Sequence, residues 1–586
     1  MMIKTLAVHI RGFVKESVMT PFFMILEVIM EMLIPILMAM MIDNGINGDT
    51  ENKMGYILMI GGLMIVCAAL ALFSGAMGAI YGAKASAGFA RNLRQAMFER
   101  IQTFSFANID KYSTAGLVTR MTTDVTNLQN AYQMILRICF RAPVTLIVAT
   151  TMTMIINLRL ASVYLIAVSF LGIVLIFVLK KTRKYFTQVF EKYDELNASV
   201  QENVSSIRVV KAFVREDYEN KKFNRAANNL YRLFVRAEKM IVSVSPVMML
   251  TMYASIIAIS WFGATMIVGG ELTTGELTSM LTYCMNILMS LMMLAFIFVM
   301  VTMSIASAKR IEGVLIEQST LTNPENPDFE VKDGSIDFEN VYFSYNDTAE
   351  KPVLNNINLS IKSGETIGII GGTGSSKTSL INLIGRLYDV TDGCVRVGGK
   401  DVREYDLETL RDEVSVVLQK NVLFSGTIYE NLRWGNENAT DEECRKACEL
   451  ACADDFISAF PDGYNTKIEQ GGTNVSGGQK QRICIARALL KKPKILILDD
   501  STSAVDTATD ARIRKAFANE IPNTTKIIIS QRISSVENAD RIIVMDDGCI
   551  SGIGTHDELV KSNAIYSEIY SAQTGGSGDF DRKGEA

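Results

Sequence analysis

The sequence has few histidines and no cysteine pattern typical of a metal site. Only two of its 586 residues are histidine, His9 and His556, and the nine cysteines show no paired metal-ligand spacing. Cys444, Cys448 and Cys452 recur every four residues, which places them on one face of a helix. Because no histidine or fourth cysteine lies nearby, we favour inward packing of this helix face over the alternative of a metal site.

The sequence also lacks a strong net charge and does not predict a cleavable leader. The net charge is −5, which gives no reason to expect nucleic acid as a partner. The chain does not open with the basic stretch, short apolar segment and small-residue site of a secretory signal, so we expect no cleaved signal peptide. Scattered free thiols fit a reducing compartment.

Apolar residues are abundant and unevenly placed. Hydrophobic residues make up 49% of the chain, and the mean hydropathy is +0.21. Of the 31 methionines, all but Met545 precede residue 311. The first half has the long apolar runs of a membrane protein, whereas the second half has the mixed, charged composition of a soluble α/β domain.

Six segments are long enough to cross a bilayer, which takes about 20 apolar residues per helix. They are residues 18–42, 56–82, 134–157, 160–180, 241–268 and 278–305. Lysine and arginine predominate in alternate loops, with Arg159 as the exception. The positive-inside rule therefore places the N-terminus and the soluble half in the cytoplasm.

Two stretches between spans, residues 83–133 and 181–240, are amphipathic and rich in helix formers. Helices of this length extend about 35–40 Å beyond the membrane at about 1.5 Å per residue. Each has a break near its middle, at 108–116 and 205–217, which predicts a short helix at the tip. We favour a role in contacting a cytoplasmic partner over an ordinary helical hairpin, because the two hairpins match in length.

Glu27 and Glu31 lie one turn apart in the first span, where ionisable residues are candidates for function. They bind a cationic substrate or a proton, or they pair with Arg137 or Arg141, and the sequence leaves both alternatives open. A polar stretch with two prolines marks the domain boundary. The predicted division is a transmembrane domain over 1–310, a linker over 311–333, a soluble domain over 334–575 and a flexible tail over 576–586.

The stretch TIGIIGGTGSSKTSL, residues 366–380, predicts a strand, a glycine-rich loop and a helix start, which is the context of a phosphate-binding loop. Lys377 is expected to reach the β- and γ-phosphates of ATP, and Thr378 to reach Mg²⁺. The usual pattern has glycine at position 376, where this chain has Ser376. The expected phosphate-binding residues are Gly371, Gly372, Thr373, Gly374, Ser375, Ser376, Lys377, Thr378 and Ser379.

Three further residues are placed to complete this site. Asp499 follows a run of aliphatic residues and is expected to hold Mg²⁺. Gln419 ends another apolar run and is expected to sense the metal or a water molecule. Tyr345 is expected to stack on adenine, the alternative being an ordinary strand aromatic.

A second anion site is predicted in NVSGGQKQR, residues 474–482. Ser476, Gly477 and Gly478 open a helix there, followed by Gln479, and a helix N-terminus attracts anions. Two half-sites in one chain indicate a dimer in which each half-site completes the other.

Taken in order, these motifs resemble the nucleotide-binding domain of ABC transporters. Six spans before them, with long intracellular helices, resemble a half-transporter of the ABC exporter type. The resemblance covers nearly the whole chain and implies an all-α six-helix transmembrane domain followed by an α/β P-loop ATPase domain.

The resemblance also implies an assembly. Two subunits sandwich two ATP–Mg²⁺, each between one chain's phosphate loop and the other chain's Ser476–Gln479 motif. The tip helices near 108–118 and 206–216 act as coupling helices, and the second reaches the partner's nucleotide domain. The expected location is the bacterial plasma membrane, with a cytoplasmic nucleotide domain.

Besides Ser376, two positions of the nucleotide site depart from the family pattern. In the family, a glutamate follows the metal aspartate and orients the attacking water, and a histidine further on contacts the γ-phosphate. Here Asp500 and Gln531 occupy those positions. The carboxylate of Asp500 is displaced by about an ångström, which is expected to cost about a hundredfold in rate. Gln531 is neutral, although it can still donate a hydrogen bond to phosphate.

Asp500, Gln531 and Ser376 all fall on one nucleotide site, whereas the Ser476–Gln479 motif is intact. The chain thus resembles the degenerate-site subunit of heterodimeric bacterial multidrug-type exporters. The expected function is ATP-driven export of small lipophilic, drug-like substrates through membrane lipid, with a second subunit that carries the family's glutamate and histidine. The alternatives are a homodimeric exporter or lipid flippase, a regulatory ATP-sensing subunit and an importer.

Overall fold

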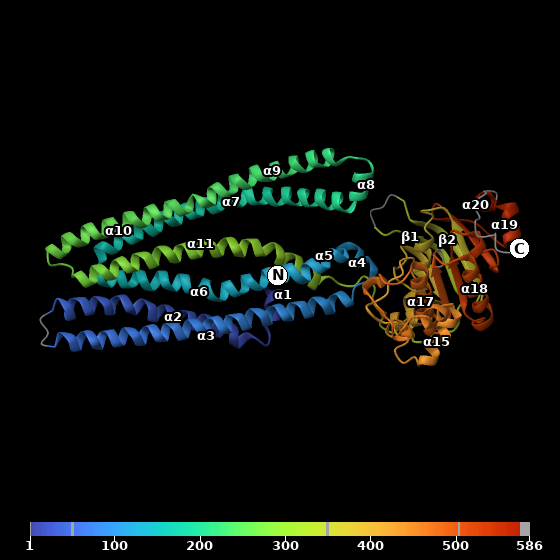
Figure 1. Cartoon of the computed structure of the whole chain (residues 1–586), viewed down its shortest axis with the longest axis horizontal. Helices are drawn as coiled ribbons and strands as arrows, with labels where there is room; N and C mark the ends of the chain where they lie inside the picture. Colours follow the sequence, from blue (N-terminus) through green and yellow to red (C-terminus); the bar gives the residue numbers. More distant parts are fainter. Residues whose placement is uncertain (1, 49–51, 347–350, 502–503, 575–586) are drawn as a thin grey trace. The chain divides into compact units, whose positions relative to one another are not determined.

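The computed structural model describes residues 2–48, 52–346, 351–501 and 504–574, and the predicted tail at 576–586 lies outside them. The chain divides into two compact units, which Figure 1 draws in sequence colours. The transmembrane unit is Met1–Gln102 with Ser113–Glu317, and the nucleotide unit is Thr103–Tyr112 with Gln318–Ala586.

The transmembrane unit is built of helices. Their bounds are α1 Met2–Ala7, α2 Val14–Met40, α3 Lys53–Gln102, α5 Thr114–Thr119, α6 Val125–Ile156, α7 Leu158–Ser205, α8 Ile207–Ala212, α9 Glu216–Val242, α10 Val244–Val268 and α11 Thr274–Ile316. Within the described residues, six helical stretches are long and apolar enough to cross a membrane, and each overlaps one of the six predicted spans. The all-α class of this half is confirmed.

Two buried tyrosines join the helices of this unit through hydrogen bonds from their hydroxyl groups. Tyr164 of α7 is 1% exposed, and its hydroxyl donates to the carbonyl of Met280 in α11 at 2.7 Å. Tyr283 is fully buried and donates to the carbonyl of Met32 in α2 at 2.6 Å. A buried hydroxyl without a partner is costly, so these bonds fix how α2, α7 and α11 pack.

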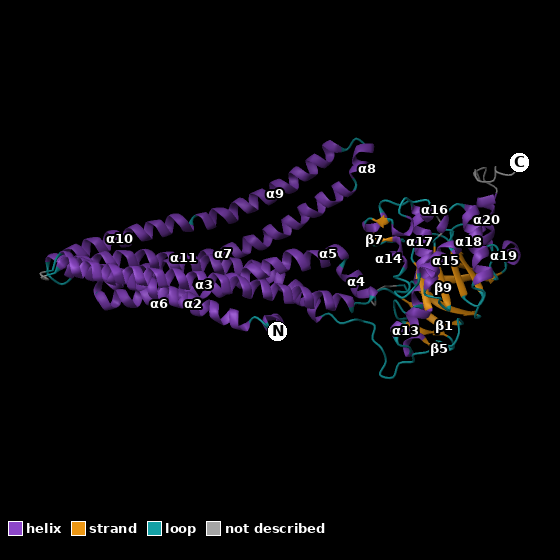
Figure 2. Cartoon of the chain, turned by 60° about the horizontal axis from the view of Figure 1, so that its bottom comes forward, coloured by secondary structure: helices purple, strands orange, loops and turns teal. Residues whose placement is uncertain are grey.

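The two predicted tip helices are present. α4, Phe106–Tyr112, follows α3, and α8 lies between α7 and α9, which run side by side (Figures 1 and 2). α4 belongs to the nucleotide unit, whereas α8 belongs to the transmembrane unit and buries none of its residues. Apolar side chains around α8, namely Val209, Phe213 and Val214, are 56%, 73% and 81% exposed.

The helix α11 runs further than the sequence indicates. Ile311 and Val314 are fully buried, so the apolar helical face continues past residue 310. The first six residues of the predicted linker are consequently helical, and the nucleotide unit takes over at Gln318.

The nucleotide unit contains strands and short helices, coloured orange and purple in Figure 2. The strands are β1 Ile336–Phe343, β2 Leu354–Ile361, β3 Thr366–Gly371, β4 Asp392–Val397, β5 Lys400–Asp401, β6 Val414–Val417, β7 Gly426–Thr427, β8 Lys467–Ile468, β9 Ile495–Asp499, β10 Thr525–Ile529, β11 Arg541–Asp546 and β12 Cys549–Gly554. The helices besides α4 are α12 Lys377–Ile384, α13 Leu407–Glu413, α14 Ile428–Leu432, α15 Asp441–Leu450, α16 Asp454–Ser458, α17 Gly477–Leu490, α18 Thr507–Glu520, α19 His556–Ser562 and α20 Ala564–Thr574.

Two sheets organise this unit. The larger has the order β12-β11-β3-β10-β9-β6, in which β11, β3, β10, β9 and β6 are parallel and β12 pairs antiparallel at the edge. The smaller, antiparallel sheet has the order β2-β1-β4-β5. The α/β class of this half is confirmed.

The cysteines of α15 pack into the core of this unit. Cys444 and Cys448 are fully buried within one apolar cluster, and Cys452 is 6% exposed beside them. Burial raises the pKa of the Cys448 thiol to about 12, so it stays protonated at neutral pH. The predicted inward packing is confirmed.

Candidate functional site

The predicted site residues converge on one edge of the large sheet. β3, β10, β9 and β6 are parallel neighbours, so their carboxyl ends lie together. The phosphate loop follows β3, Asp499 ends β9, Gln531 follows β10 and Gln419 follows β6. In open α/β sheets, ligands bind beyond the carboxyl ends of the strands, and the predicted site residues of this chain lie at that edge.

The phosphate loop wraps around its own lysine. Lys377 Nζ donates to the carbonyls of Gly371 and Gly372 at 2.9 and 2.8 Å and to Ser375 Oγ at 3.0 Å. Burial lowers the pKa of Lys377, and the carboxylates of Asp499 and Asp500 oppose that shift. The ammonium group is thereby held at the N-terminus of α12, where backbone N–H groups and a positive charge suit phosphate.

Ser376 has a left-handed backbone, with φ 69° and ψ 23°. This conformation costs a residue with a Cβ about 1–2 kcal/mol, and glycine avoids the cost. The usual glycine at this position therefore has a second physical reason, in addition to the close approach of phosphate and backbone.

Replacing this serine is expected to stabilise the loop. Ser376→Gly should raise the unfolding free energy of the full chain by about 1 kcal/mol and leave ATP binding equal or tighter. Thermal unfolding with and without ATP measures both quantities. The neighbouring change Ser375→Gly is the matched control, because Ser375 has no positive φ and accepts the Lys377 hydrogen bond, so it should destabilise. Equal effects of the two variants would contradict this explanation.

Thr378 and Asp499 form a pair of oxygen ligands. Thr378 Oγ1 donates to Asp499 Oδ2 at 2.9 Å, and Asp499 is 2% exposed. Burial raises the pKa of Asp499, which the hydrogen bond from Thr378 partly offsets. A hydroxyl beside a carboxylate at the end of a strand fits Mg²⁺, which binds oxygen and keeps several of its waters.

Asp500 and Gln531 face each other across β9 and β10. Gln531 Nε2 donates to Asp500 Oδ2 at 3.5 Å, a long hydrogen bond. Asp500 has a positive φ of 49° and donates its backbone N–H to the carbonyl of Ile529 at 3.0 Å. Burial raises the pKa of Asp500, and a hydrogen bond from Gln419 opposes this. The structure thus brings together all three predicted catalytic residues.

Tyr345 lies beside the phosphate-loop helix. Its hydroxyl is 2.9 Å from Ser379 Oγ, and the residue is 46% exposed. Phe343 and Tyr388 contact its ring edge-on, with centroids 4.8 and 5.1 Å away. The exposed ring area next to the phosphate loop is suited to stacking on a purine.

The predicted second anion site lies at the N-terminus of α17, which its own residues cap. Ser476 caps α17 and forms a capping box with Gln479, in which each side chain accepts from the other residue's backbone N–H. Gly477 is exposed, and a Cβ there would meet only Ala504 Cβ at 3.5 Å. In the described part of the chain, no hydrogen bond joins Ser476 or Gln479 to the phosphate loop, so the two half-sites stay separate within one chain.

The sequence-based prediction missed two further residues of the site, Gln481 and Tyr388. Gln481 Oε1 accepts from the backbone N–H of Ala504 at 3.0 Å, which ties α17 to the loop after β9. Tyr388 donates to Asp110 of α4 at 2.6 Å and contacts Phe106 with centroids 6.0 Å apart. The place of Gln481, five residues after Ser476, was a usable signal, whereas nothing in the sequence joined Tyr388 to α4.

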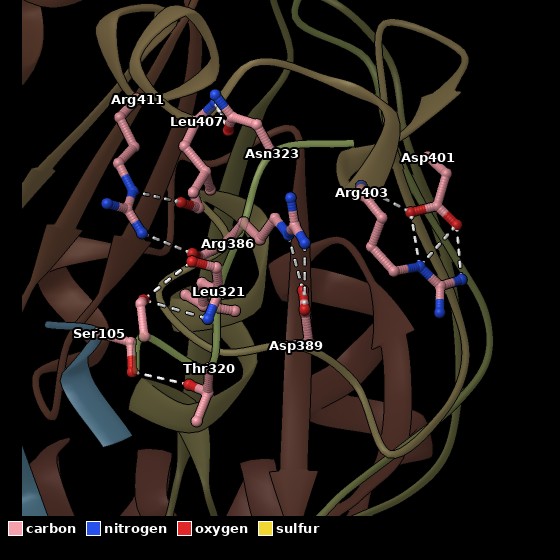
Figure 3. A network of polar contacts seen from close by, with 12 residues as sticks. Ser105, Thr320, Leu321, Asn323, Arg386, Asp389, Asp401, Arg403, Leu407 and Arg411 are labelled. Atoms are coloured by element: carbon pink, nitrogen blue, oxygen red, sulfur yellow. Dashed lines mark hydrogen bonds and ion pairs between the residues drawn. The ribbon is translucent and has the colours of Figure 1, made fainter. Parts of the chain in front are cut away.

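α4 and the segment after α11 are fastened to the nucleotide unit. Asn108 is 2% exposed and donates from Nδ2 to the carbonyl of Gln318 at 3.1 Å. The hydroxyls of Ser105 and Thr320 are 2.7 Å apart, and Asn323 accepts from the N–H of Leu407 at 3.0 Å (Figure 3). Tyr388 contacts both α4 and Tyr345, so it connects the predicted first coupling helix to the tyrosine that is expected to stack on adenine.

The membrane carboxylates are paired. Arg141 donates to Glu27 Oε1 at 2.7 Å and to Glu31 Oε2 at 3.0 Å. Of the two alternatives left by the sequence, pairing with a basic residue is the one in the structure, and the partner is Arg141.

Six helices that are long and apolar enough to cross a membrane, joined to an α/β domain that matches the ABC transporter description, define a multi-pass, ATP-hydrolysing transporter with a cytoplasmic nucleotide domain. The chain belongs to the ABC transporter family. The family description "ABC transporter transmembrane region" matches residues 18–292, and "ABC transporter" matches residues 354–503.

Curated relatives match nearly the whole chain. "Uncharacterized ABC transporter ATP-binding protein YfiB" of Bacillus subtilis is 36% identical over 555 residues, which cover 95% of this chain and 96% of the relative. The "ATP-dependent lipid A-core flippase" of Desulfotalea psychrophila is 33% identical, covering 82% of this chain and 84% of its own. The solved "Structure of a bacterial Atm1-family ABC exporter with ATP bound" has TM-score 0.82 at 22% identity, covering 96% and 99%, and shows the exporter fold.

Proposed function

We propose that this chain is the degenerate-site subunit of a heterodimeric ABC exporter. Its phosphate loop binds ATP–Mg²⁺ and hydrolyses it slowly, and its Ser476–Gln479 motif completes the hydrolytic site of a second, different subunit. That subunit carries glutamate and histidine at the positions of Asp500 and Gln531. The cargo is a small lipophilic molecule, and ATP binding closes the dimer to turn the membrane halves outward.

The pair Asp500–Gln531 carries this proposal. Both side chains stand at the carboxyl edge where a water would attack the γ-phosphate, and they contact each other at 3.5 Å. The shorter carboxylate lies about an ångström from the position that a glutamate would reach, and the neutral amide supplies no cation. The shorter carboxylate of Asp500 and the uncharged side chain of Gln531 both weaken the groups that act on the attacking water and the γ-phosphate. Together they support retained ATP binding with weakened hydrolysis.

Nucleotide binding itself is supported by intact chemistry. Lys377, Thr378 and Asp499 keep the residue types that phosphate and Mg²⁺ need, and the two oxygen ligands are 2.9 Å apart. When bound, Mg²⁺ supplies positive charge that neutralises the phosphates. Lys377 is already at the helix N-terminus and exchanges carbonyl partners for phosphate oxygens without a large movement.

Surfaces offered to a partner are preserved. ABC exporters function as dimers. Ser476 and Gly477 are exposed at the capped N-terminus of α17, and in the described part of the chain Ser476 has no hydrogen bond to the phosphate loop. The exposed apolar side chains Val209, Phe213 and Val214 around α8 support contact with the partner's nucleotide domain.

Two alternatives remain defined. A homodimeric exporter or lipid flippase, in which Asp500 suffices as base, is favoured by the relatives described as lipid A-core flippases. A regulatory ATP-sensing subunit that transports nothing is disfavoured by six spans with two tip helices.

The assembly purified from native membranes through a tag on this chain separates these functions. Asp500→Asn preserves shape and removes the base, so we expect ATP turnover of the assembly to fall by less than about twofold. The control is the corresponding change in the partner subunit, in which the glutamate at the position of Asp500 is replaced by glutamine. This change should abolish ATP turnover. Complete loss with Asp500→Asn would establish the homodimeric alternative instead.

A further inference from the structure

The transmembrane unit has a half-open cavity of about 390 Å³ between α2, α6 and α11, helices that Figure 1 shows in one bundle. One face of α6 forms its polar wall. Asn130, Gln133, Arg137 and Arg141 recur at spacings of three and four residues, so they form a continuous stripe. Methionines from all three helices, including Met24, Met134 and Met293, form most of the apolar wall, together with Ile138.

The charge that faces this cavity is positive. Arg137 and Arg141 line it, and no carboxylate is among the lining residues that the structure describes. Glu27 and Glu31 both bond Arg141, with Glu27 13% exposed. Glu27 also interacts electrostatically with Arg137, but its hydrogen bond within the described residues goes to Arg141.

Arg137 is different from Arg141. Its Nε atom is buried and has no hydrogen-bond partner within the described part of the chain. Glu27 Oε2 is likewise without one, but that carboxylate already pairs with Arg141 through Oε1. The Arg137 side chain is partly buried, and a buried guanidinium nitrogen without a hydrogen bond is costly inside a membrane, which favours an anionic group at this position.

We propose that this cavity binds the anionic head of an amphiphile, with Arg137 donating to its phosphate or carboxylate oxygens and Asn130 and Gln133 donating from their amides. The guanidinium fork fits such groups in two-point geometry. The methionine walls take the apolar chain, because their flexible thioethers adapt to varied shapes. The inference rests on the proposed transport of lipophilic cargo and narrows it to anionic amphiphiles.

Lipid binding to the purified full chain in a neutral maltoside detergent tests this. The probes are dioleoyl phosphatidic acid, dioleoyl phosphatidylcholine and a dioleoyl trimethylammonium lipid, with inorganic phosphate as the competitor without a chain. We expect phosphatidic acid to bind about tenfold tighter than the other two lipids, and phosphate to compete at least about a hundredfold less well than the lipid.

Variants assign the preference to one residue. Arg137→Gln should remove the preference for phosphatidic acid, and Arg137→Lys should keep most of it because the charge remains. Arg159→Gln is the matched control, because Arg159 is 82% exposed at the outer end of α7 and should change nothing. Helical content and thermal unfolding of each variant show that it has folded.

Equal binding of the three lipids, or an unchanged preference in Arg137→Gln, would overturn the proposal. If inorganic phosphate competes as well as the lipid, the cavity recognises only the anionic group, and the proposal that it binds an amphiphile is wrong. Binding needs no hydrolysis, so fast ATP turnover by this chain alone would refute the heterodimer and leave the lipid result standing. Conversely, the absence of a lipid preference would leave the proposed heterodimer and its ATP-hydrolysis results unaffected.

Discussion

The double variant Asp500→Glu, Gln531→His is expected to hydrolyse ATP about a hundredfold faster than the unaltered chain, when each is purified alone. The added methylene extends the carboxylate toward the attacking water, and the imidazole gives the γ-phosphate a contact that an amide cannot match. Steady-state ATP turnover at saturating ATP–Mg²⁺ measures the gain.

The single variants should fall well short of the double variant. Asp500 and Gln531 are in contact at 3.5 Å, so a change at one alters the surroundings of the other, and their effects are not expected to add. Lys377→Ala in the double variant is the control that returns turnover to background. A double variant no faster than the unaltered chain would mean that these two residues do not limit hydrolysis.

The second large effect is expected from charge placed on the Ser476–Gln479 motif. Gly477→Asp sets a carboxylate where the partner's γ-phosphate would lie. The change is mild for its own chain, because a Cβ at Gly477 meets only Ala504 Cβ at 3.5 Å and an acid is favourable at a helix N-terminus. Opposed negative charges should lower hydrolysis at the facing site by about a hundredfold.

Mixed dimers show which chain the motif serves. A chain with the restored site, Asp500→Glu with Gln531→His, is combined with a chain of the original sequence, and Gly477→Asp is placed on one chain or the other. We expect fast turnover when the aspartate is on the restored chain, because its site is completed by the intact motif of the other. Turnover should be lost when the aspartate is on the other chain.

Gly477→Ala at the same two places is the control for shape without charge, and it should leave most of the activity. Equal turnover of the two mixed dimers would contradict the exchange of motifs between subunits.

The transmembrane helices were predictable because an apolar run of about 20 residues matches the length of a helix that crosses the bilayer core. The far end of α11 was not, because Ile311 and Val314 read as the start of a linker until their burial is seen. The partner of Glu27 was undecided for a similar reason. Arg137 and Arg141 lie one turn apart on the same face, and only packing distinguishes them.

The nucleotide site was predictable in its residue types and less so in its geometry. Short motifs identified Lys377, Thr378 and Asp499, because phosphate and Mg²⁺ demand those groups. The contact between Asp500 and Gln531 depends on β9 and β10 being neighbours in the sheet, and strand order is not local information. The left-handed backbone conformation of Ser376 was also not predicted, because the close approach of phosphate already explained the usual glycine at that position.

The identity of the nucleotide that stays on the protein tests the central claim most directly. The purified full chain is loaded with ATP–Mg²⁺ at 37 °C, freed of unbound nucleotide and denatured, and the released nucleotide is separated into ATP and ADP. The account predicts close to one ATP per chain with little ADP, whereas the restored double variant yields mostly ADP. Predominantly ADP from the unaltered chain, produced as fast as by the restored variant, would contradict it.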